Sequence, residues 1–544
     1  MASKQWHKEM AVYQIWTRSF CDGNGDGIGD LWGVLSKLDY IRSLGVDAIW
    51  FSPIYPSPNA DFGYDISDYM DINPEYGDLG VFRQVLDGAH ERGMRVFMDL
   101  VVNHTSDEHK WFIESRKSKD NPYHDYYIWR PGKTVRGKRR PPNNWTSMFE
   151  GGAWEYDEGL DEYYLHVFAK KQPDLNMDNP KVREEVKRIM QFWLDMGVDG
   201  FREDVITFIS KTEGLPDSHP WLPAANGYKY YSNGPRVHQY LMEFKRDVLD
   251  CYDCFTVGES PLTTADIALQ YVTEGPDQVL DEMIAFSHME ADCFMIDMVQ
   301  LPFNLVKMKR AFSDWQYKLA GRGWNALYIE NHDHPRIISR YGNEAYRNES
   351  GKMLAAMYML QRGTPFIYQG QEIGMLNLRL PDVNMYEDVM THNAVRIASK
   401  IMPKKKVLEM VQRSCRDSAR SPMQWSDGEN DERITPFGKF LRRTRMDELP
   451  QFAQILTGKM SLVGPRPERE CFYGKFETYI HGFSERLKVK PGLTGLAQVS
   501  GGYDLRPEEK VVYDIEYIKK RSLWLDLKCI LLTVRIIFSH NGAR

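Results

Sequence analysis

The 544-residue sequence lacks most of the features that mark exported or membrane-spanning proteins. Its first residues, MASKQWHKEMAVYQIW, have no apolar run after a basic segment, which argues against a secretory signal. The apolar stretch 524–538 is shorter than the ~20 residues that a spanning helix needs, and it carries charged side chains. Seven scattered cysteines, with Cys251 and Cys254 as one closely spaced pair, predict buried free thiols rather than a zinc site. These absences favour a reduced, cytoplasmic setting.

The charge distribution is uneven along the chain. The net charge of −7 divides into −13 for residues 1–430 and +6 for residues 431–544. The acidic first part does not suit nucleic acid, whereas the basic excess in the last part suits anionic lipid or a diphosphate, or is a solvated face. The sign changes within 426–431, in the stretch QWSDGENDERITPFGKF.

Short β-rich runs alternate with helical segments through the first 430 residues. The predicted strands are 11–16, 48–54, 96–102, 200–205, 255–259, 325–331, 364–370 and a weaker one near 283–289. Eight parallel β/α units predict an α/β protein with a (β/α)8 TIM barrel, whose chemistry lies at the C-terminal ends of the strands. A Trp-, Tyr-, Gly- and Pro-rich insertion at 105–170 predicts a small subdomain over the barrel mouth.

Carboxylates follow several of these strands. In GFREDV, alternation places Arg202 and Asp204 on the face toward the barrel interior, and Glu203 on the face toward the helices, as part of an ion pair. Arg202 would hold Asp204 ionised, as a nucleophile requires. Three carboxylates at neighbouring strand ends, Asp204, Glu259 and Asp333, suit glycoside cleavage. In a retaining enzyme the attacking and proton-transferring pair lies ~5–5.5 Å apart.

Longer motifs make the resemblance specific. The stretches DLVVNHTSDEH, GFREDVI, TVGES and ENHDHPR resemble the four conserved regions of the α-amylase superfamily, closest to oligo-1,6-glucosidases and related α-glucosidases. The similarity extends over residues 6–426 and includes ADFGYDISDY, PPNNW, QPDLNMDNP, TPFIYQGQEIGM and RDSARSPMQW. It implies that Asp204 is the nucleophile, Glu259 the acid/base and Asp333 the transition-state stabiliser.

The same resemblance implies a binding pocket for the non-reducing glucose. Its lining residues would be Asp61, Tyr64, His104, Arg202 and His332. Either Arg420 or Arg416 would pair with Asp61 and close the pocket. Val205, directly after the nucleophile, occurs in relatives that prefer α-1,6 links, whereas His334 stands where these relatives usually have Gln.

The segment DGNGDGIGD offers oxygen ligands at alternate positions. The predicted ligands are Asp22, Asn24, Asp26, the carbonyl of Ile28, and Asp30. Hard oxygen donors on a Gly-rich turn suit a structural Ca²⁺, or Mg²⁺, and the pattern resembles the metal loop of the same subfamily. A polar turn without a metal is the alternative.

From residue 431 onward the sequence resembles a different family. The motifs DERITPFGKFLRRTRMDELPQF, MSLVGPRPERE and KPGLTGLAQVSGG resemble the C-terminal part of bacterial sugar transferases, the monotopic phosphoglycosyl transferases. The resemblance implies that Asp447 is a nucleophile, that Glu448 helps to hold Mg²⁺ and that Arg466 binds phosphate. The membrane helix that begins such proteins is missing upstream; the apolar stretch 524–538 would lie on a membrane surface or pack as a helix.

The sequence therefore predicts an apparent fusion of two truncated parts. The expected organisation is barrel at 1–104, inserted subdomain at 105–170, barrel at 171–426 without its last helix or the usual C-terminal β-sandwich, a seam at 427–430, and a partial α/β sugar-transferase domain at 431–544. The leading prediction is a retaining α-glucosidase that releases glucose from short α-1,6-linked gluco-oligosaccharides. The alternatives are a sucrose isomerase or trehalose-6-phosphate hydrolase, a phosphoglycosyl transferase that uses polyprenyl phosphate, and an inactive fusion.

Overall fold

The computed structural model divides the chain into two compact units, Met1–Trp425 and Ser426–Arg544. It describes residues 6–149, 151–219, 225–294, 296–425, 455, 457–467, 480, 483–501 and 507–539. Each unit is described by itself.

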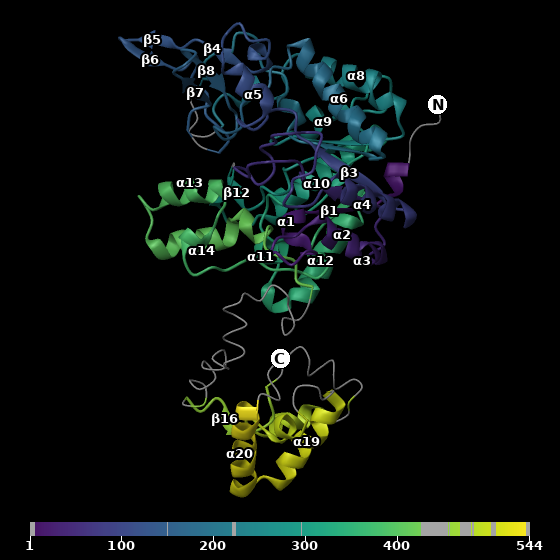
Figure 1. Cartoon of the computed structure of the whole chain (residues 1–544), viewed down its shortest axis with the longest axis vertical. Coiled ribbons are helices and arrows are strands. Elements are labelled where there is room, and N and C mark those ends of the chain that lie inside the picture. Colours follow the sequence, from purple (N-terminus) through teal and green to yellow (C-terminus); the bar gives the residue numbers. More distant parts are fainter. Residues whose placement is uncertain are drawn as a thin grey trace. The chain divides into compact units, whose positions relative to one another are not determined.

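The first unit is built on an eight-stranded, all-parallel sheet (Figure 1). Its strands in chain order are β1 (Val12–Ile15), β2 (Ala48–Phe51), β3 (Arg95–Leu100), β9 (Gly200–Glu203), β10 (Phe255–Glu259), β11 (Glu282–Ile284), β14 (Ala326–Leu327) and β15 (Thr364–Tyr368). The spatial order is β11-β10-β9-β3-β2-β1-β15-β14, and the edge strands β11 and β14 lie in contact, so the barrel is nearly closed. All eight predicted strands are present, including the weak one, which forms at 282–284. The predicted barrel is confirmed.

Helices between the strands form the outer layer of the barrel. They include α2 (Leu31–Ser36), α3 (Leu38–Ser43), α4 (Leu79–Glu91), α6 (Pro180–Met196), α8 (Val237–Asp247), α9 (Ala265–Val272), α10 (Leu305–Leu319) and α12 (Arg347–Met359). Two more helices, α13 (Val389–Ala398) and α14 (Lys404–Ser414), follow the last strand β15. Helix α6 illustrates how the local sequence sets such bounds. The side chain of Asn179 accepts a hydrogen bond from the Lys181 amide, Pro180 occupies the first turn, and Gly197 ends the helix at a φ of 109°.

The inserted segment lies between β3 and α6. It contains α5 (Lys110–Ser115), a three-stranded antiparallel sheet of β4 (Trp129–Arg130), β8 (Glu162–Leu165) and β7 (Trp154–Asp157), and a hairpin of β5 (Lys133–Val135) and β6 (Lys138–Arg140). Met148, Phe149 and Phe168 of this segment line the main pocket at the C-terminal ends of the strands. The insertion therefore contributes one apolar wall of that pocket.

The second unit is small. Its elements are a parallel pair, β16 (Ser461–Val463) and β17 (Gly492–Thr494), and the helices α18 (Leu496–Gly501), α19 (Pro507–Lys520) and α20 (Leu523–Ser539). A buried ion pair of 2.7 Å joins Arg486 Nε to Asp514 Oδ2. Among the helices that the structure describes, none is long and apolar enough to span a membrane. The predicted seam at 427–430, Asp447 and Glu448 lie outside the described residues.

Candidate active site

Arg202 on β9 is the centre of a buried charge cluster at the C-terminal ends of the strands. Its Nη1 donates to Asp204 Oδ1 at 2.6 Å and to Asp99 Oδ1 at 2.8 Å. Its Nη2 pairs with Glu259 Oε1 at the end of β10. All four side chains are at least nine-tenths buried. The predicted inward orientation of Arg202 and Asp204 is confirmed, and one guanidinium holds two of the three predicted catalytic carboxylates.

The cluster contains more negative than positive charge. Burial raises the pKa of Asp204; the neighbouring Glu259 and Asp99 raise it further, and Arg202 opposes them. Burial likewise raises the pKa of Asp99 to about 6, against the attraction of Arg202. Arg202 acts to keep Asp204 ionised, as predicted, but burial outweighs it, so Asp204 and Asp99 hold a proton more readily than exposed carboxyl groups do.

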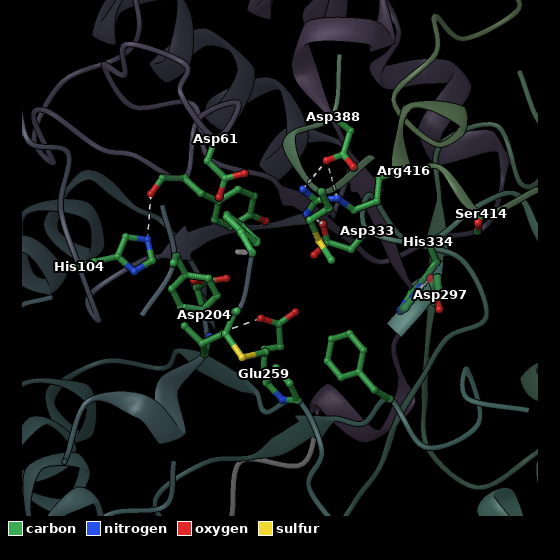
Figure 2. A pocket seen from close by; sticks show the side chains of 18 residues that line it. Asp61, His104, Asp204, Glu259, Asp297, Asp333, His334, Asp388, Ser414 and Arg416 are labelled. Carbon is green, nitrogen blue, oxygen red and sulfur yellow. Dashed lines mark hydrogen bonds and ion pairs between the residues drawn. The ribbon is translucent and has the colours of Figure 1, made fainter. Parts of the chain in front are cut away.

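Asp333 lies in a second, cationic environment in the same pocket (Figure 2). Its Oδ1 accepts hydrogen bonds from Arg416 Nη1 at 2.9 Å and from Arg420 Nη2 at 3.0 Å, and His332 Nε2 lies 3.3 Å from its Oδ2. Burial acts to raise the pKa of Asp333, but His332 and the two arginines outweigh it and hold the pKa well below its usual value. Asp333 therefore remains an anion.

The prediction that Arg416 or Arg420 pairs with Asp61 is wrong for this structure. Both guanidiniums bind Asp333, and Arg416 also donates from Nε to Asp388 Oδ1 at 2.9 Å. Asp61 Oδ2 instead accepts a hydrogen bond from Gln172 Nε2 at 3.0 Å. Burial raises the pKa of Asp61 to about 7 although the two arginines act to lower it. Both arginines therefore form their direct hydrogen bonds with Asp333, and Arg416 also with Asp388, instead of with Asp61.

The remaining predicted pocket residues form one connected wall. Tyr64 Oη lies 2.7 Å from His332 Nε2 and 3.2 Å from Asp99 Oδ2, and its ring stacks on the ring of His332. His104 Nε2 lies 3.1 Å from Gln172 Nε2, and burial lowers the pKa of His104 to about 4, so the ring is neutral. The structure therefore brings the predicted residues of the glucose pocket together.

The two residues that flank Asp204 are unusual, Val205 in its backbone conformation and Glu203 in its burial. Val205 has a φ of +35°, a left-handed conformation that is strained for a β-branched side chain, and its amide lies 3.4 Å from Glu259 Oε2. Glu203 is fully buried and, contrary to the prediction, forms no ion pair within the described part of the chain. Its Oε2 has no hydrogen-bond partner there, and burial raises its pKa to about 8. Among the described residues, the layer between β9 and the helices supplies no cation at that point.

The pocket around these groups has a volume of about 210 Å³. Among its charged or titratable lining residues, three are not part of the site predicted from the sequence: Asp297, His334 and Asp388. Asp388 caps α13 by accepting the Thr391 amide at 2.8 Å, and Asp297 Oδ2 lies 2.8 Å from His334 Nδ1. Only the departure of His334 from the usual Gln could have indicated any of them.

In the predicted metal loop, the carboxylate oxygens of Asp22 and Asp30 accept hydrogen bonds from backbone amides. Asp22 accepts the amides of Gly25 and Gly27 at 2.6 and 2.8 Å, and Asp30 Oδ2 accepts those of Gly23 and Asn24. Within the described residues, no three His, Cys, Asp or Glu side chains converge as a metal-binding group. The oxygen donors of the loop are chemically suitable for Ca²⁺ or Mg²⁺.

The cysteines that the structure describes are all free, as predicted. Cys254 is buried, whereas Cys251 is exposed, which corrects the expectation that the pair is buried.

Comparison with known proteins places the geometry in a family. The model of the α-amylase catalytic domain matches residues 14–435. The chain belongs to the α-amylase family. It is thus a glycoside hydrolase by family, as the sequence motifs predicted. The bacterial sugar transferase model matches residues 390–540, which overlap the first match between 390 and 435.

Relatives of this α-amylase-family chain cover most of its first unit. An oligo-1,6-glucosidase of Parageobacillus thermoglucosidasius is 53% identical over 431 residues, which cover 78% of this chain and 76% of the relative. The crystal structure of Bacillus licheniformis trehalose-6-phosphate hydrolase has a TM-score of 0.74 at 44% identity, covering 79% of this chain and 76% of that one. The structure of isomaltulose synthase from Klebsiella sp. LX3 has a TM-score of 0.74 at 40% identity, covering 78% and 76%.

Proposed function

We propose that the chain is a retaining α-glucosidase that releases glucose from short α-1,6-linked gluco-oligosaccharides. The observation that carries the proposal is that Arg202 holds Asp204 and Glu259 on one guanidinium, which keeps the two carboxyl groups close together. A close pair suits a retaining mechanism, because a separated pair is needed only where a water must fit between the sugar and the base. The name and 53% identity of the oligo-1,6-glucosidase relative support the α-1,6 linkage.

In this reaction Asp204 attacks the anomeric carbon while Glu259, as the acid, protonates the departing glycosidic oxygen. Water then breaks the glucosyl ester at Asp204 as Glu259 takes its proton. Asp333, which His332, Arg416 and Arg420 hold ionised, stabilises the positive charge that develops on the sugar ring. Asp61, Tyr64 and His104 bind the hydroxyls of the terminal glucose.

The charge of the pocket argues against a phosphorylated substrate. Its lining includes the carboxyl groups of Asp61, Asp204, Glu259, Asp297, Asp333 and Asp388. Arg416 is the one lysine or arginine among these lining residues, and its guanidinium already binds Asp333 and Asp388. A sugar phosphate would therefore meet repulsion rather than a bidentate partner. This favours the glucosidase over the trehalose-6-phosphate hydrolase alternative.

The experiment is turnover of isomaltose, maltose, sucrose and trehalose 6-phosphate by the full chain and its Asp204→Asn variant. We expect glucose from isomaltose at the highest kcat/KM, and a loss of about 10⁴-fold or more in the variant. Glu203→Gln is the matched control, because it changes the adjacent carboxyl group on the opposite face of β9. No turnover of any sugar would point to the inactive fusion, and isomaltulose from sucrose would point to the isomerase.

We also propose that the loop 22–30 binds a structural Ca²⁺, or Mg²⁺. Asp22, Asn24 and Asp26 are exposed or partly exposed oxygen donors, which supports the proposal. When the ion binds, these oxygens would give up hydrogen bonds from backbone amides of the loop and coordinate the ion instead. The loop follows the first strand and lies apart from the catalytic carboxylates in sequence, so the ion would act on stability.

The second unit carries two further proposals. Helix α20 exposes apolar side chains, Leu523, Trp524, Leu527 and Leu531, beside the basic residues Lys519, Lys520, Arg521 and Lys528, which supports weak contact of a cytoplasmic protein with an anionic membrane surface. Co-sedimentation with anionic vesicles, and its loss in Trp524→Ser, tests this. Transferase activity would need Mg²⁺ and Asp447, so label transfer from a nucleotide sugar to polyprenyl phosphate should be lost in Asp447→Asn, and no transfer by the unmodified chain would exclude the activity.

A further inference from the structure

The hairpin of β5 and β6 concentrates positive charge on an otherwise acidic unit. Six lysine or arginine side chains, and no acidic one, occur in the eleven residues 130–140, and all eleven residues are exposed. Residues 1–430, which contain this hairpin, carry a net charge of −13. Figure 1 shows the hairpin as a projection from the outer edge of the first unit. The charge of the unit is therefore reversed locally, on an element that reaches into solvent.

A tight turn gives the hairpin a defined shape. Arg136 and Gly137 occupy the two central positions of this turn, with φ values of +52° and +73°. Two successive residues with positive φ form the two-residue turn whose twist matches that of the paired strands. Three residue pairs then join β5 to β6. The basic side chains are thus presented by an ordered element.

Alternation along the two strands gives the hairpin two different faces. On one face Arg139 lies over the ring of Tyr156, 4.3 Å from its centroid, and pairs with Asp161 at 2.6 Å. This face is therefore the one that contacts the rest of the inserted segment. The opposite face, the cationic face, consists of Lys133, Val135, Lys138 and Arg140.

The cationic face places like charges opposite one another. Lys133 and Arg140 form a directly opposed cross-strand pair, an arrangement that destabilises a hairpin. Lys133 pairs with Asp217 at 3.0 Å, whereas Lys138 and Arg140 form no ion pair with any residue that the structure describes. The same is true of Arg136 in the turn. Three cations therefore remain available to an anion outside the unit.

A flat surface of anionic lipid headgroups fits these features better than an extended polyanion does. Val135, 44% exposed, lies beside the unpaired cations, and basic residues next to an apolar one suit the headgroup region of a bilayer. A strand of three residues is ~10 Å long, about one Debye length in 0.1 M salt, so the projecting charges reach such a surface while the acidic barrel is screened from it. A nucleic acid duplex would extend past the hairpin and meet the repulsion of the acidic barrel.

We propose that the hairpin of β5 and β6 docks the first unit on membranes rich in anionic phospholipid, separately from the contact proposed for α20. Each basic residue close to such a surface strengthens binding by about fivefold. The attraction is electrostatic, so it weakens as salt shortens the Debye length to ~3 Å at 1 M.

The test is co-sedimentation of the full chain with vesicles of equal parts phosphatidylglycerol and phosphatidylcholine in about 0.1 M salt. Trp524→Ser is present throughout and removes the contact proposed for α20. Arg136→Asn/Lys138→Gln removes two of the three unpaired cations, and it preserves the hairpin because Asn-Gly is a favoured pair in this turn. Lys309→Gln/Arg310→Gln on α10 removes two other exposed cations and is the matched control.

We expect the Trp524→Ser chain to bind these vesicles and not vesicles of phosphatidylcholine alone. The hairpin variant should bind about tenfold or more weakly, and the α10 variant should stay within about threefold. No binding by the Trp524→Ser chain, unchanged binding in the hairpin variant, or an equal loss in both double variants would overturn the inference.

Duplex DNA and polyglutamate at the same salt concentration test other classes of partner. Tighter binding to either polymer than to the vesicles, lost in the hairpin variant, would assign the hairpin to that partner and overturn the membrane assignment. The measurement requires no turnover of a sugar, so its result is independent of the proposed glucosidase activity.

Discussion

Arg416 donates a hydrogen bond from Nη1 to Asp333 Oδ1 over 2.9 Å, and the two residues lie 83 positions apart in the sequence. The same guanidinium binds Asp388, so a residue near the end of the first unit connects the stabilising carboxylate to the cap of α13. The position of Asp333 therefore depends on a chain segment that follows the last barrel strand.

Arg416→Met should lower kcat/KM on isomaltose by about 10²-fold, on the scale measured when one preorganised electrostatic contact is removed. Without Arg416, the pKa of Asp333 rises and its carboxylate is less firmly oriented. Steady-state kinetics measure the effect. Arg379→Met, which removes an exposed arginine paired with Glu344, serves as the control and should leave kcat/KM within about twofold.

Asp99→Asn should move the acid limb of the pH profile of kcat/KM toward lower pH. Activity falls in acid because protonation of Asp204 removes the nucleophile, and the raised pKa of Asp204 places this limb above the usual Asp value of 3.8. Removing the negative charge of Asp99 lessens the repulsion that raises the pKa of Asp204. It also removes a carboxylate that competes for Arg202, so Arg202 stabilises the ionised Asp204 more strongly. Glu158→Gln on the surface is the control; a limb that moves to higher pH in Asp99→Asn would contradict the charge cluster as described.

Glu203→Gln should stabilise the protein more at pH 8 than at pH 5. The folded-state pKa of about 8 lies above the ordinary 4.5, so the folded protein keeps a proton that the unfolded chain releases. The free energy of unfolding contributed by Glu203 therefore falls as pH rises through that window. Removing the carboxylate should raise Tm at pH 8 by at least about 2 °C relative to the change at pH 5. Equal changes at both pH values would show that Glu203 does not titrate there.

Millimolar Ca²⁺ should raise Tm, and EDTA should reverse the rise, if the loop 22–30 binds the ion. Saturation at ~100 times the dissociation constant corresponds to about 2.7 kcal/mol. Asp26→Ala should abolish the response, because it removes one oxygen donor, whereas Glu158→Ala removes an exposed acid elsewhere and should not. An identical Ca²⁺ response in both variants would place the ion at another site.

The barrel was predictable because each strand is a local apolar run, and all eight are present at the expected places. The catalytic carboxylates were predictable for a related reason. Asp204 and Glu259 end or directly follow short buried strands, and alternation along β9 sets which side chains face inward. That Glu203 has no ion-pair partner among the described residues was not predictable, because any partner would come from a helix layer whose side chains the strand does not specify.

The family, the barrel and the identity of the inward-facing charges follow from the amino-acid sequence, since these depend on residue type and on periodicity within single elements. Three-dimensional packing was needed to show that Arg416 binds Asp333 and Asp388 rather than Asp61, and that Glu203 is buried without a cation among the described residues. The main pocket likewise arises where residues from distant segments, including Asp61, Phe168 and Arg416, meet in space. Contacts of this kind depend on how elements that are distant in the sequence pack together, so local sequence patterns do not predict them.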